Sequence, residues 1–338
     1  MRIGLAFDLK EQALGPSGPD DLQEEFDSPV TIQALADVIK DLGHEVILLG
    51  DGRELLRRLL ADPPDFVFNI AEGHGASRSR EARVPAVLEM LNIPYSGSDP
   101  LTLAVTLDKD CARRLVASAG VPVPMGFVVQ PDEHFGSYGR RLWSSIDGPF
   151  PVIVKPAWEG SSKGIRQHCI ADDREQLVEV INELRQAYSQ PVLVEEFVQG
   201  DELTVGVLGN NPPSILGVMR VVPVQPSDRF IYSLEIKRDY QRQVCYECPP
   251  PYSREVLERI ETAAINSYRA LGCRDVSRVD FRLRNGIPYF LEVNPLPGIN
   301  PETSDLVILA GLRDWSYRQL IATILQNAFE RTGVKSSH

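Results

Sequence analysis

The sequence has no apolar run close to the roughly 20 residues that a membrane-spanning helix needs. Residues 1–7 lead directly into a strand-like pattern and lack the charged, apolar and small-residue regions of a signal peptide. There are only five cysteines, and an odd number is typical of reduced thiols rather than of a disulfide framework. We therefore expect a cytoplasmic protein without a membrane segment.

Strong positive charge and the common nucleotide-binding motifs are missing as well. The net charge of -12 and the isoelectric point near 5.0 disfavour nucleic acid or an anionic membrane as the main partner. Neither G-x-G-x-x-G nor G-x-x-x-x-G-K-[ST] occurs, which excludes a Rossmann fingerprint and a Walker A loop. The one close cysteine pair, Cys245 and Cys248, has no second pair or nearby histidine to complete a zinc site.

The composition is otherwise that of an ordinary globular protein. With 338 residues, 43% of them hydrophobic, the chain can bury a large core in two or three domains. Up to residue 97 the patterns alternate, predicting strands at 2–7, 45–49 and 66–70 and helices at 30–42, 53–60 and 85–91. This alternation indicates a small doubly wound α/β domain, whose ligands meet the loops after its strands, here residues 8–28 and 72–83.

The rest of the chain mixes helical and extended patterns. It predicts helices at 109–119, 174–187, 253–271 and 314–329 and strands at 151–156, 191–198 and 203–208. The polar run 232–248 has no clear helical period, so we expect a covering loop there. Between two of these elements, the loop 157–165 holds two glycines, two serines and Lys163. Such donors suit a lid over a triphosphate, although an ordinary surface turn is the alternative.

The stretch 278–304 carries the strongest chemical pattern. Apolar and polar residues alternate on both sides of Asn285-Gly286, which predicts a β-hairpin. Asp280 on the first strand and Glu292 and Asn294 on the second can then converge. Two carboxylates and an amide oxygen, without cysteine or histidine nearby, suit Mg²⁺ rather than zinc. A hairpin with a solvated polar face is the alternative.

Six motifs occur in a fixed order, and together they resemble the ATP-grasp enzymes, most closely the D-alanine:D-alanine ligase family. They are D-K (108–109), P-V-I-V-K-P (151–156), E-G-S-S-K-G-I (159–165), V-L-V-E-E-F (192–197), R-V-D-F (278–281) and E-V-N-P-L-P-G (292–298). The resemblance implies a mixed α/β and α+β architecture, an ATP-grasp fold behind an N-terminal doubly wound domain. It places the domains at residues 1–97, 98–197 and 198–334.

By the same resemblance, individual residues acquire nucleotide-binding roles. The set that it implies is Lys109, Lys155, Ser162, Glu195, Phe197, Val198, Glu202, Lys237 and Leu291. The lysines would contact the phosphates of ATP, Glu195 the adenine amino group and Glu202 the ribose.

The resemblance also implies the metal site and the catalytic groups. Two Mg²⁺ or Mn²⁺ ions would be held by Asp280, Glu292 and Asn294. Arg278 and the Gly298 amide would polarise the reaction intermediate, with Ser161 of the lid beside the reacting groups.

Departures from the family pattern fall in the substrate region. The family's short opening motif is replaced by residues 8–28, and the loop 71–85 has arginines where the family has acids. The substrate residues implied are Asp27, His74, Arg78, Arg80, Arg83, Arg238 and Thr303. Because arginine binds carboxylates in a fork, we expect one loop arginine to select a donor with an extra acidic group or a longer polar side chain. The alternative is that at least two of these arginines are solvated or pair with Glu72 and Glu81 to fix the loop.

The function that we expect is an ADP-forming carboxylate–amine ligase that joins two small amino-acid-like substrates through an acyl phosphate. An authentic D-alanine:D-alanine ligase is the first alternative. A nucleotide-binding protein without turnover is the second, and the intact set of catalytic groups disfavours it. The resemblance also implies a homodimer built on the N-terminal domain.

Overall fold

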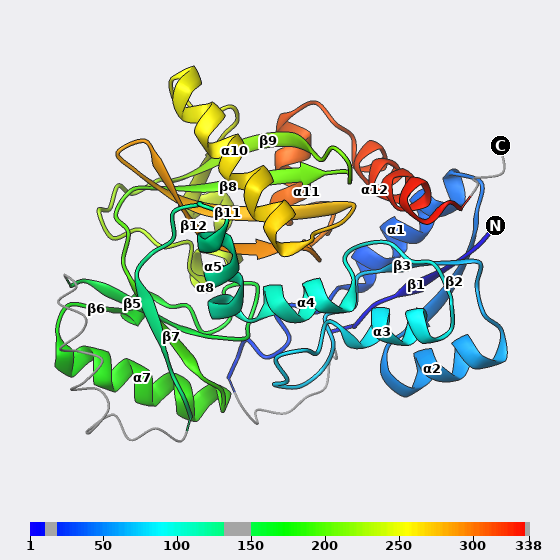
Figure 1. Cartoon of the computed structure of the whole chain (residues 1–338), viewed down its shortest axis with the longest axis horizontal. Coiled ribbons are helices and arrows are strands. Elements are labelled where there is room, and N and C mark those ends of the chain that lie inside the picture. The colour runs from blue at the N-terminus through cyan, green and yellow to red at the C-terminus, as the bar shows by residue number, and fades with distance from the viewer. Residues whose placement is uncertain (11–18, 132–149, 335–338) are drawn as a thin grey trace.

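The computed structural model describes residues 1–10, 19–131 and 150–334, and within these ranges the strands form three sheets (Figure 1). The sheets follow one another along the chain. Their strand orders are β2-β1-β3, β4-β7-β5-β6 and β10-β9-β8-β11-β12.

The N-terminal sheet is parallel, as the alternating pattern predicts. Its strands are β1 (Arg2–Ala6), β2 (Glu45–Gly50) and β3 (Phe66–Asn69), and its helices are α1 (Pro29–Asp41), α2 (Gly52–Ala61) and α3 (Arg83–Met90). Ser28 begins α1 by accepting a hydrogen bond from the N–H of Thr31. Because the strands are parallel, their carboxyl ends meet at one edge, and the loops that follow them gather there.

The middle sheet is antiparallel and has one long helix on it. Its strands are β4 (Gly126–Val129), β5 (Val152–Pro156), β6 (Ile170–Ala171) and β7 (Val192–Glu196), with the short helix η1 (Gln167–Cys169) before β6. Helix α7 (Arg174–Tyr188) buries Leu177, Ile181 and Leu184 against this sheet. Helices α4 (Pro100–Leu107) and α5 (Lys109–Ser118) precede it in the chain.

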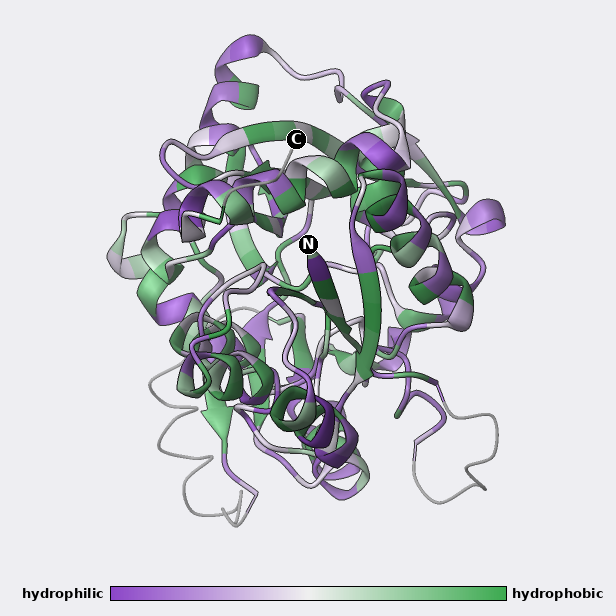
Figure 2. Cartoon of the chain, turned by 90° about the vertical axis from the view of Figure 1, so that its right-hand side faces the viewer, coloured by the Kyte–Doolittle hydropathy of each residue, from purple (hydrophilic) through white to green (hydrophobic). Residues whose placement is uncertain are grey.

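The C-terminal sheet is also antiparallel and carries helices on both faces. Its elements are β8 (Asp201–Leu208), β9 (Ser214–Pro223), α8 (Leu234–Arg238), α9 (Tyr240–Gln243), β10 (Val244–Glu247), α10 (Arg254–Leu271), β11 (Val276–Arg284), β12 (Ile287–Asn294), α11 (Asp305–Leu312) and α12 (Tyr317–Thr332). Ile260 and Ala264 of α10 pack on one face, and Leu309 of α11 packs in the core on the other. In Figure 2 hydrophobic colour runs along both strands and helices, and the helices carry hydrophilic turns beside their hydrophobic ones.

The final helix connects the two ends of the chain. Helix α12 packs against α1, and Phe329 contacts the Phe66 ring with centroids 4.9 Å apart. One core cluster therefore contains both N-terminal residues such as Ile39 and C-terminal residues such as Ile324. None of the helices in the described ranges is long and apolar enough to cross a membrane.

The predicted hairpin is present, and the predicted covering loop is only partly a loop. Strands β11 and β12 pair antiparallel around Asn285 and Gly286, whose φ angles of 54° and 74° suit a type I′ turn. The run 232–248, in contrast, contains the short helices α8 and α9 and the edge strand β10. Helices of five and four residues are too short to show a period, and β10 owes its conformation to pairing with β9.

Candidate active site

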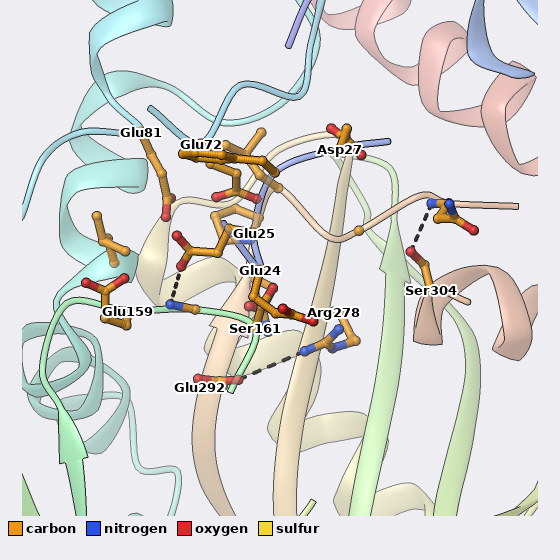
Figure 3. Close-up of a pocket in the computed structure, with 18 of the residues that line it drawn as sticks. Glu24, Glu25, Asp27, Glu72, Glu81, Glu159, Ser161, Arg278, Glu292 and Ser304 are labelled. Carbon is orange, nitrogen blue, oxygen red and sulfur yellow. Dashed lines mark hydrogen bonds and ion pairs between the residues drawn. The ribbon is translucent and has the colours of Figure 1, made fainter. Parts of the chain in front are cut away.

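Two pockets adjoin at the β11–β12 hairpin. The first, here called the sheet pocket, lies between the middle and C-terminal sheets and is lined by Lys155, Glu195 and Lys237 among others. The second, here called the loop pocket, lies under the N-terminal loops, and its lining includes Asp27 and Ser161 (Figure 3). The residues that line both pockets are Arg278 and Glu292.

The hairpin brings the three predicted metal ligands together. Asp280 lies directly opposite Glu292 in the register of the two strands, and the Nδ2 of Asn294 is 3.3 Å from Asp280 Oδ2. Arg278 Nη2 donates to the same Asp280 oxygen at 2.9 Å, and Lys109 Nζ donates to Glu292 Oε2 at 2.6 Å. The alternation of β11 explains this arrangement, because its apolar residues face the core and the intervening polar ones face the pockets.

Charge in this cluster is only partly balanced. Burial, opposed by the charge of Arg278 and reinforced by that of Glu292, leaves the pKa of Asp280 raised. Burial acts in the same direction on Glu292, but the charges of Lys109 and Lys237 outweigh it and hold the pKa of Glu292 well below its usual range. Two neighbouring carboxylates in a buried place favour an additional positive charge between them.

The sheet pocket combines apolar walls with charged ends. Phe197, Val198 and Leu291 belong to its lining. At one end Lys155 Nζ donates to Glu195 Oε2 at 2.8 Å, and Glu202 pairs with Arg282 at 3.0 Å.

Lys237 and the lid define the other side of the sheet pocket. The Nζ of Lys237 lies 5.0 Å from the centre of the Tyr232 ring and has no ion-pair partner in the part of the chain that the structure describes. Ser162 of the lid donates to the Tyr232 carbonyl at 3.0 Å, which closes residues 157–165 over the pocket. Ser161 and Ser162 have φ angles of 49° and 60°, a left-handed conformation that is uncommon outside glycine and concentrates at functional loops.

The lid is fastened to the N-terminal segment 19–28. Glu25 accepts from the Gly160 N–H and pairs with Lys163 at 3.1 Å, and Asp21 accepts from the Gly164 N–H at 2.9 Å. Lys163 therefore points to acids of this chain, which corrects the expectation that it serves a phosphate. Burial acts to raise the pKa of Glu25, but the charges of Arg80 and Lys163 outweigh burial and leave that pKa lowered.

The loop pocket holds carboxyl groups whose burial is offset only in part by cations, since Lys10 acts on Asp27 and Arg80 acts on Glu72 and Glu81. Asp27, Glu72 and Glu81 line it, and within the described ranges none of them has an ion-pair partner. Glu72 and Glu81 are hydrogen-bonded to each other. Burial raises the pKa of Glu81 to about 8, and burial together with the charge of Asp8 raises that of Asp27 to about 7. Figure 3 shows these acids around the cavity.

The predicted arginines do not reach this pocket. Arg80, with 1% of its side chain exposed, pairs with Glu25 at 2.8 Å and with Glu159 at 3.2 Å. Arg78 pairs with Asp108 at 2.8 Å, and Arg83 donates to the His74 carbonyl at 2.8 Å. The prediction that one of them selects an acidic donor stays a prediction, and in this structure all three arginines bind groups of the chain itself. Their role is close to the alternative, because they hold the loop, although mainly through acids other than Glu72 and Glu81.

Two further predicted substrate residues lie outside the pocket lining, and two lie in it. Arg238 bridges α8 to the N-terminal segment through Asp20 and Glu24, at 2.8 and 2.9 Å. His74 lies near Asp51 instead. Thr303 and Asp27 do line the loop pocket, as does Gly298, which belongs to the predicted catalytic groups.

Several pocket residues escape prediction from the sequence. They are Glu25, Glu159, Ser304 and Asp305. Asp305 is an example, since its Oδ2 accepts from Arg278 Nη1 at 3.3 Å and its Oδ1 accepts from the Tyr232 hydroxyl at 3.1 Å. An isolated acid at the start of a helix carries no signal for such a partner.

Comparison with known proteins agrees with this geometry. Residues 115–326 match the family described as D-ala D-ala ligase C-terminus. A D-alanine--D-alanine ligase of Aquifex aeolicus is 33% identical over 299 residues, which cover 87% of this chain and 93% of the relative. The chain belongs to the D-alanine:D-alanine ligase family. It is therefore a ligase.

Two further relatives align over similar lengths. The D-alanine--D-alanine ligase of Gloeobacter violaceus is 31% identical over 315 residues, covering 93% of this chain and 98% of that one. An uncharacterized protein, y4sG, of Sinorhizobium fredii is 32% identical over 302 residues, covering 87% and 85%.

Solved structures confirm the ATP-grasp fold. The D-alanine--D-alanine ligase of Bacillus anthracis complexed with ATP superposes with a TM-score of 0.71 at 23% identity, covering 98% of this chain and 99% of that one. The VanG D-Ala:D-Ser ligase of Enterococcus faecalis gives a TM-score of 0.70 at 21% identity, covering 97% and 99%.

Proposed function

We propose that this ligase uses ATP to join the carboxylate of one amino-acid-like substrate to the amine of another, releasing ADP and phosphate. The observation that carries this proposal is that Arg278 and Glu292 line both pockets. A terminal phosphate held in the sheet pocket would then meet a carboxylate held in the loop pocket. Phosphorylation is needed because hydroxide is too poor a leaving group for an amine to displace from a carboxylate.

ATP would occupy the sheet pocket. Its adenine fits between the apolar walls, with Glu195 accepting from the amino group, Phe197 and Val198 providing backbone contacts and Glu202 binding the ribose. Lys237 is available for a phosphate because no acid of the described chain pairs with it. Lys109 and Lys155 would exchange their present carboxylate partners, in part, for phosphate oxygens.

The hairpin cluster fits Mg²⁺ or Mn²⁺. Asp280, Glu292 and Asn294 offer only oxygen ligands, and the buried carboxylate pair favours an added positive charge. Magnesium, when bound, supplies positive charge to the triphosphate. The chain's own cations, Arg278 and Lys109, orient the two carboxylates and hold one on each strand of the hairpin. Two ions remain our proposal for the number.

The donor amino acid would place its ammonium against the unpaired acids Asp27, Glu72 and Glu81. This acidic wall supports a donor with a small side chain or with a further amino group, and it disfavours an additional carboxylate. Arg278 and the Gly298 N–H would then stabilise the oxyanion that forms when the amine attacks. We propose that Thr303 contacts the acceptor.

Closure over the pockets would protect the acyl phosphate from water. The lid is bonded to Glu25 and Asp21, and Arg238 joins α8 to the same N-terminal segment. Excluding water in this way favours attack by the amine over hydrolysis.

The experiment for this proposal is phosphate release with Mg²⁺ and ATP across a matrix of D- and L-amino acids as donor and acceptor. We expect release that requires both amino acids, with neutral or diamino donors preferred to aspartate and glutamate. A pair of D-alanines as the best substrates would favour the authentic D-alanine:D-alanine ligase, which the curated relatives support. Release that no amino acid stimulates would contradict the proposal.

Three coarser features are also proposals. We propose three domains at 1–97, 98–197 and 198–334, and a homodimer through the N-terminal domain, where Leu48, Leu56 and Leu60 are exposed on or beside the edge strand β2. Light scattering at several concentrations tests the dimer. The need for ATP and the free state of the described cysteines support action in the cytoplasm.

A further inference from the structure

Three side chains outside both pockets gather at the carboxyl edge of the N-terminal sheet. Asp8 follows β1, Asp51 follows β2, and His74 lies in the loop after β3. His74 Nε2 is 2.9 Å from Asp51 Oδ2 and 3.4 Å from Asp8 Oδ1. One ligand atom from each residue lies within 4.8 Å of the other two.

One oxygen of the buried Asp8 carboxylate has no hydrogen-bond partner, which favours a cation in this cluster. Its side chain is 1% exposed, and its Oδ2 accepts the Gly73 N–H at 2.8 Å, whereas its Oδ1 accepts no hydrogen bond. An unsatisfied buried carboxylate oxygen is costly.

The side chain of Asp51 also points into this cluster. It stands at the N-cap of α2, where an aspartate commonly accepts a hydrogen bond from the first turn, yet its side chain makes no such bond. It is turned toward His74 instead.

We propose that Asp8, Asp51 and His74 form a binding site for a divalent transition-metal ion of the zinc class. Two carboxylate oxygens and an imidazole nitrogen suit Zn²⁺, Co²⁺ or Mn²⁺ better than Mg²⁺ or Ca²⁺, which prefer oxygen alone. For bonds of about 2.0–2.2 Å in a tetrahedral site, ligand atoms are separated by about 3.3–3.6 Å. The 3.4 Å between His74 and Asp8 lies in this range, whereas the 2.9 Å between His74 and Asp51 is shorter, so the exposed His74 and Asp51 side chains would move slightly apart around an ion. The side chains of His74 and Asp51 are 50% and 30% exposed, so an ion can enter and water can complete its coordination.

The proposed metal site lies next to the segments that carry Asp27 and Glu72, two of the acids proposed to bind the donor. The Asp27 N–H donates to the Asp8 carbonyl at 2.9 Å, and the Phe26 ring meets the His74 ring edge-on with centroids 4.6 Å apart. Glu72 is two residues before His74. Resting on the proposed function, the ion would hold the two segments that carry Asp27 and Glu72, so that its loss would raise KM for the donor more than KM for ATP.

The test is Zn²⁺ and Co²⁺ binding to the full chain without nucleotide or amino acid, by calorimetry and by Co²⁺ absorption. A Glu292→Gln background removes the contribution of the hairpin cluster. We expect one equivalent to bind, and His74→Gln and Asp8→Asn each to weaken it at least tenfold. His168→Gln is the matched control, since that histidine is similarly exposed and pairs with a single acid, Glu183.

Unchanged affinity in His74→Gln, or no binding in the native chain, would overturn the proposal and would mean that a protonated histidine alone bridges the two acids. His74→Gln changes a half-exposed residue, so it keeps the test valid if Asp8→Asn does not fold. Because binding is measured without turnover, metal binding in a protein that makes no amide would refute only the proposed function.

Discussion

At the scale of single residues, Glu292 connects the two pockets and the cations around them. It lines both pockets, pairs with Lys109 at 2.6 Å and lies 4.0 Å from Arg278. Its charge is maintained by these cations in spite of burial. A carboxylate that is kept charged beside two pockets is suited to bind a ligand as well as to stabilise the fold.

We predict that Glu292→Gln lowers kcat for phosphate release about ten- to a hundredfold, the range expected when one charge-assisted contact is lost. The glutamine oxygen can still accept from Lys109, so the thermal midpoint should change little. Phosphate release at saturating Mg²⁺-ATP, with melting measured in parallel, checks this. An unchanged kcat would remove Glu292 from the metal site.

Glu81 gives a pH prediction for stability. Its folded pKa of about 8 lies above its ordinary value of 4.5, so the folded state binds more protons than the unfolded state between these values. Stability is therefore expected to fall as pH rises from about 5 to 8. Glu81→Gln should flatten this fall by a few degrees in Tm. The same slope in both proteins would show that Glu81 titrates normally.

At the scale of elements, the sequence predicts what has a period and misses what has none. The hairpin is predictable because its residues alternate around Asn285-Gly286. Helices α4 and α11 are not, because P-L-T-L-A-V-T-L and D-L-V-I-L-A-G-L are apolar on nearly every side. Strands β4 and β9 likewise give no separate signal.

The candidate site divides in the same way. The predicted metal ligands and Lys155, Glu195, Glu202 and Leu291 lie on strands, where a regular alternation brings their side chains to the two pockets. The donor region depends on pairings between loops, such as Arg80 with Glu25, 55 residues apart in the chain. Because no local pattern in the sequence reveals a partner so far away in the chain, the sequence alone leaves Arg80 without a partner and suggests that it faces the substrate.

Arg238 tests the connection between α8 and the N-terminal segment. Because its pairs with Asp20 and Glu24 are substantially exposed, Arg238→Ala should cost at most about 1 kcal/mol of stability. We predict instead a several-fold rise in ATP hydrolysis per amide formed, because α8 would lose its contact with the N-terminal segment and water could enter the pockets. Arg242→Ala is the control, with an 86% exposed side chain. If both variants hydrolyse the same amount of ATP per amide formed, Arg238 has no part in closing the pockets.

At the scale of the whole molecule, α12 and Asp275 join the two ends of the chain. Asp275, whose side chain is fully buried, accepts from the Gly97 N–H and from Arg331, both at 2.8 Å. Arg331 also donates to the carbonyls of Tyr95 and Gly97. Hydrogen bonds from this charge pair to the backbone of Tyr95 and Gly97 therefore hold the segment after β3 against the C-terminal sheet, in addition to the apolar contact of α12 with α1.

We predict that Arg331→Ala lowers the free energy of unfolding by about 3 kcal/mol, because it leaves Asp275 buried without its cation. Urea unfolding measures this loss. Lys40→Ala is the control, since Lys40 pairs with Asp37 on the surface at 3.7 Å. A loss as small as that of the control would show that the apolar contact of α12 with α1 alone joins the two ends of the chain.

The central claim is that a phosphate group passes from one pocket to the other, onto the donor carboxylate. Its most direct test uses a donor whose carboxylate oxygens are labelled with ¹⁸O, in a turnover with ATP and the preferred acceptor. The proposed acyl phosphate requires one labelled oxygen to appear in the released phosphate for each amide formed. Amide formation with unlabelled phosphate would contradict the account.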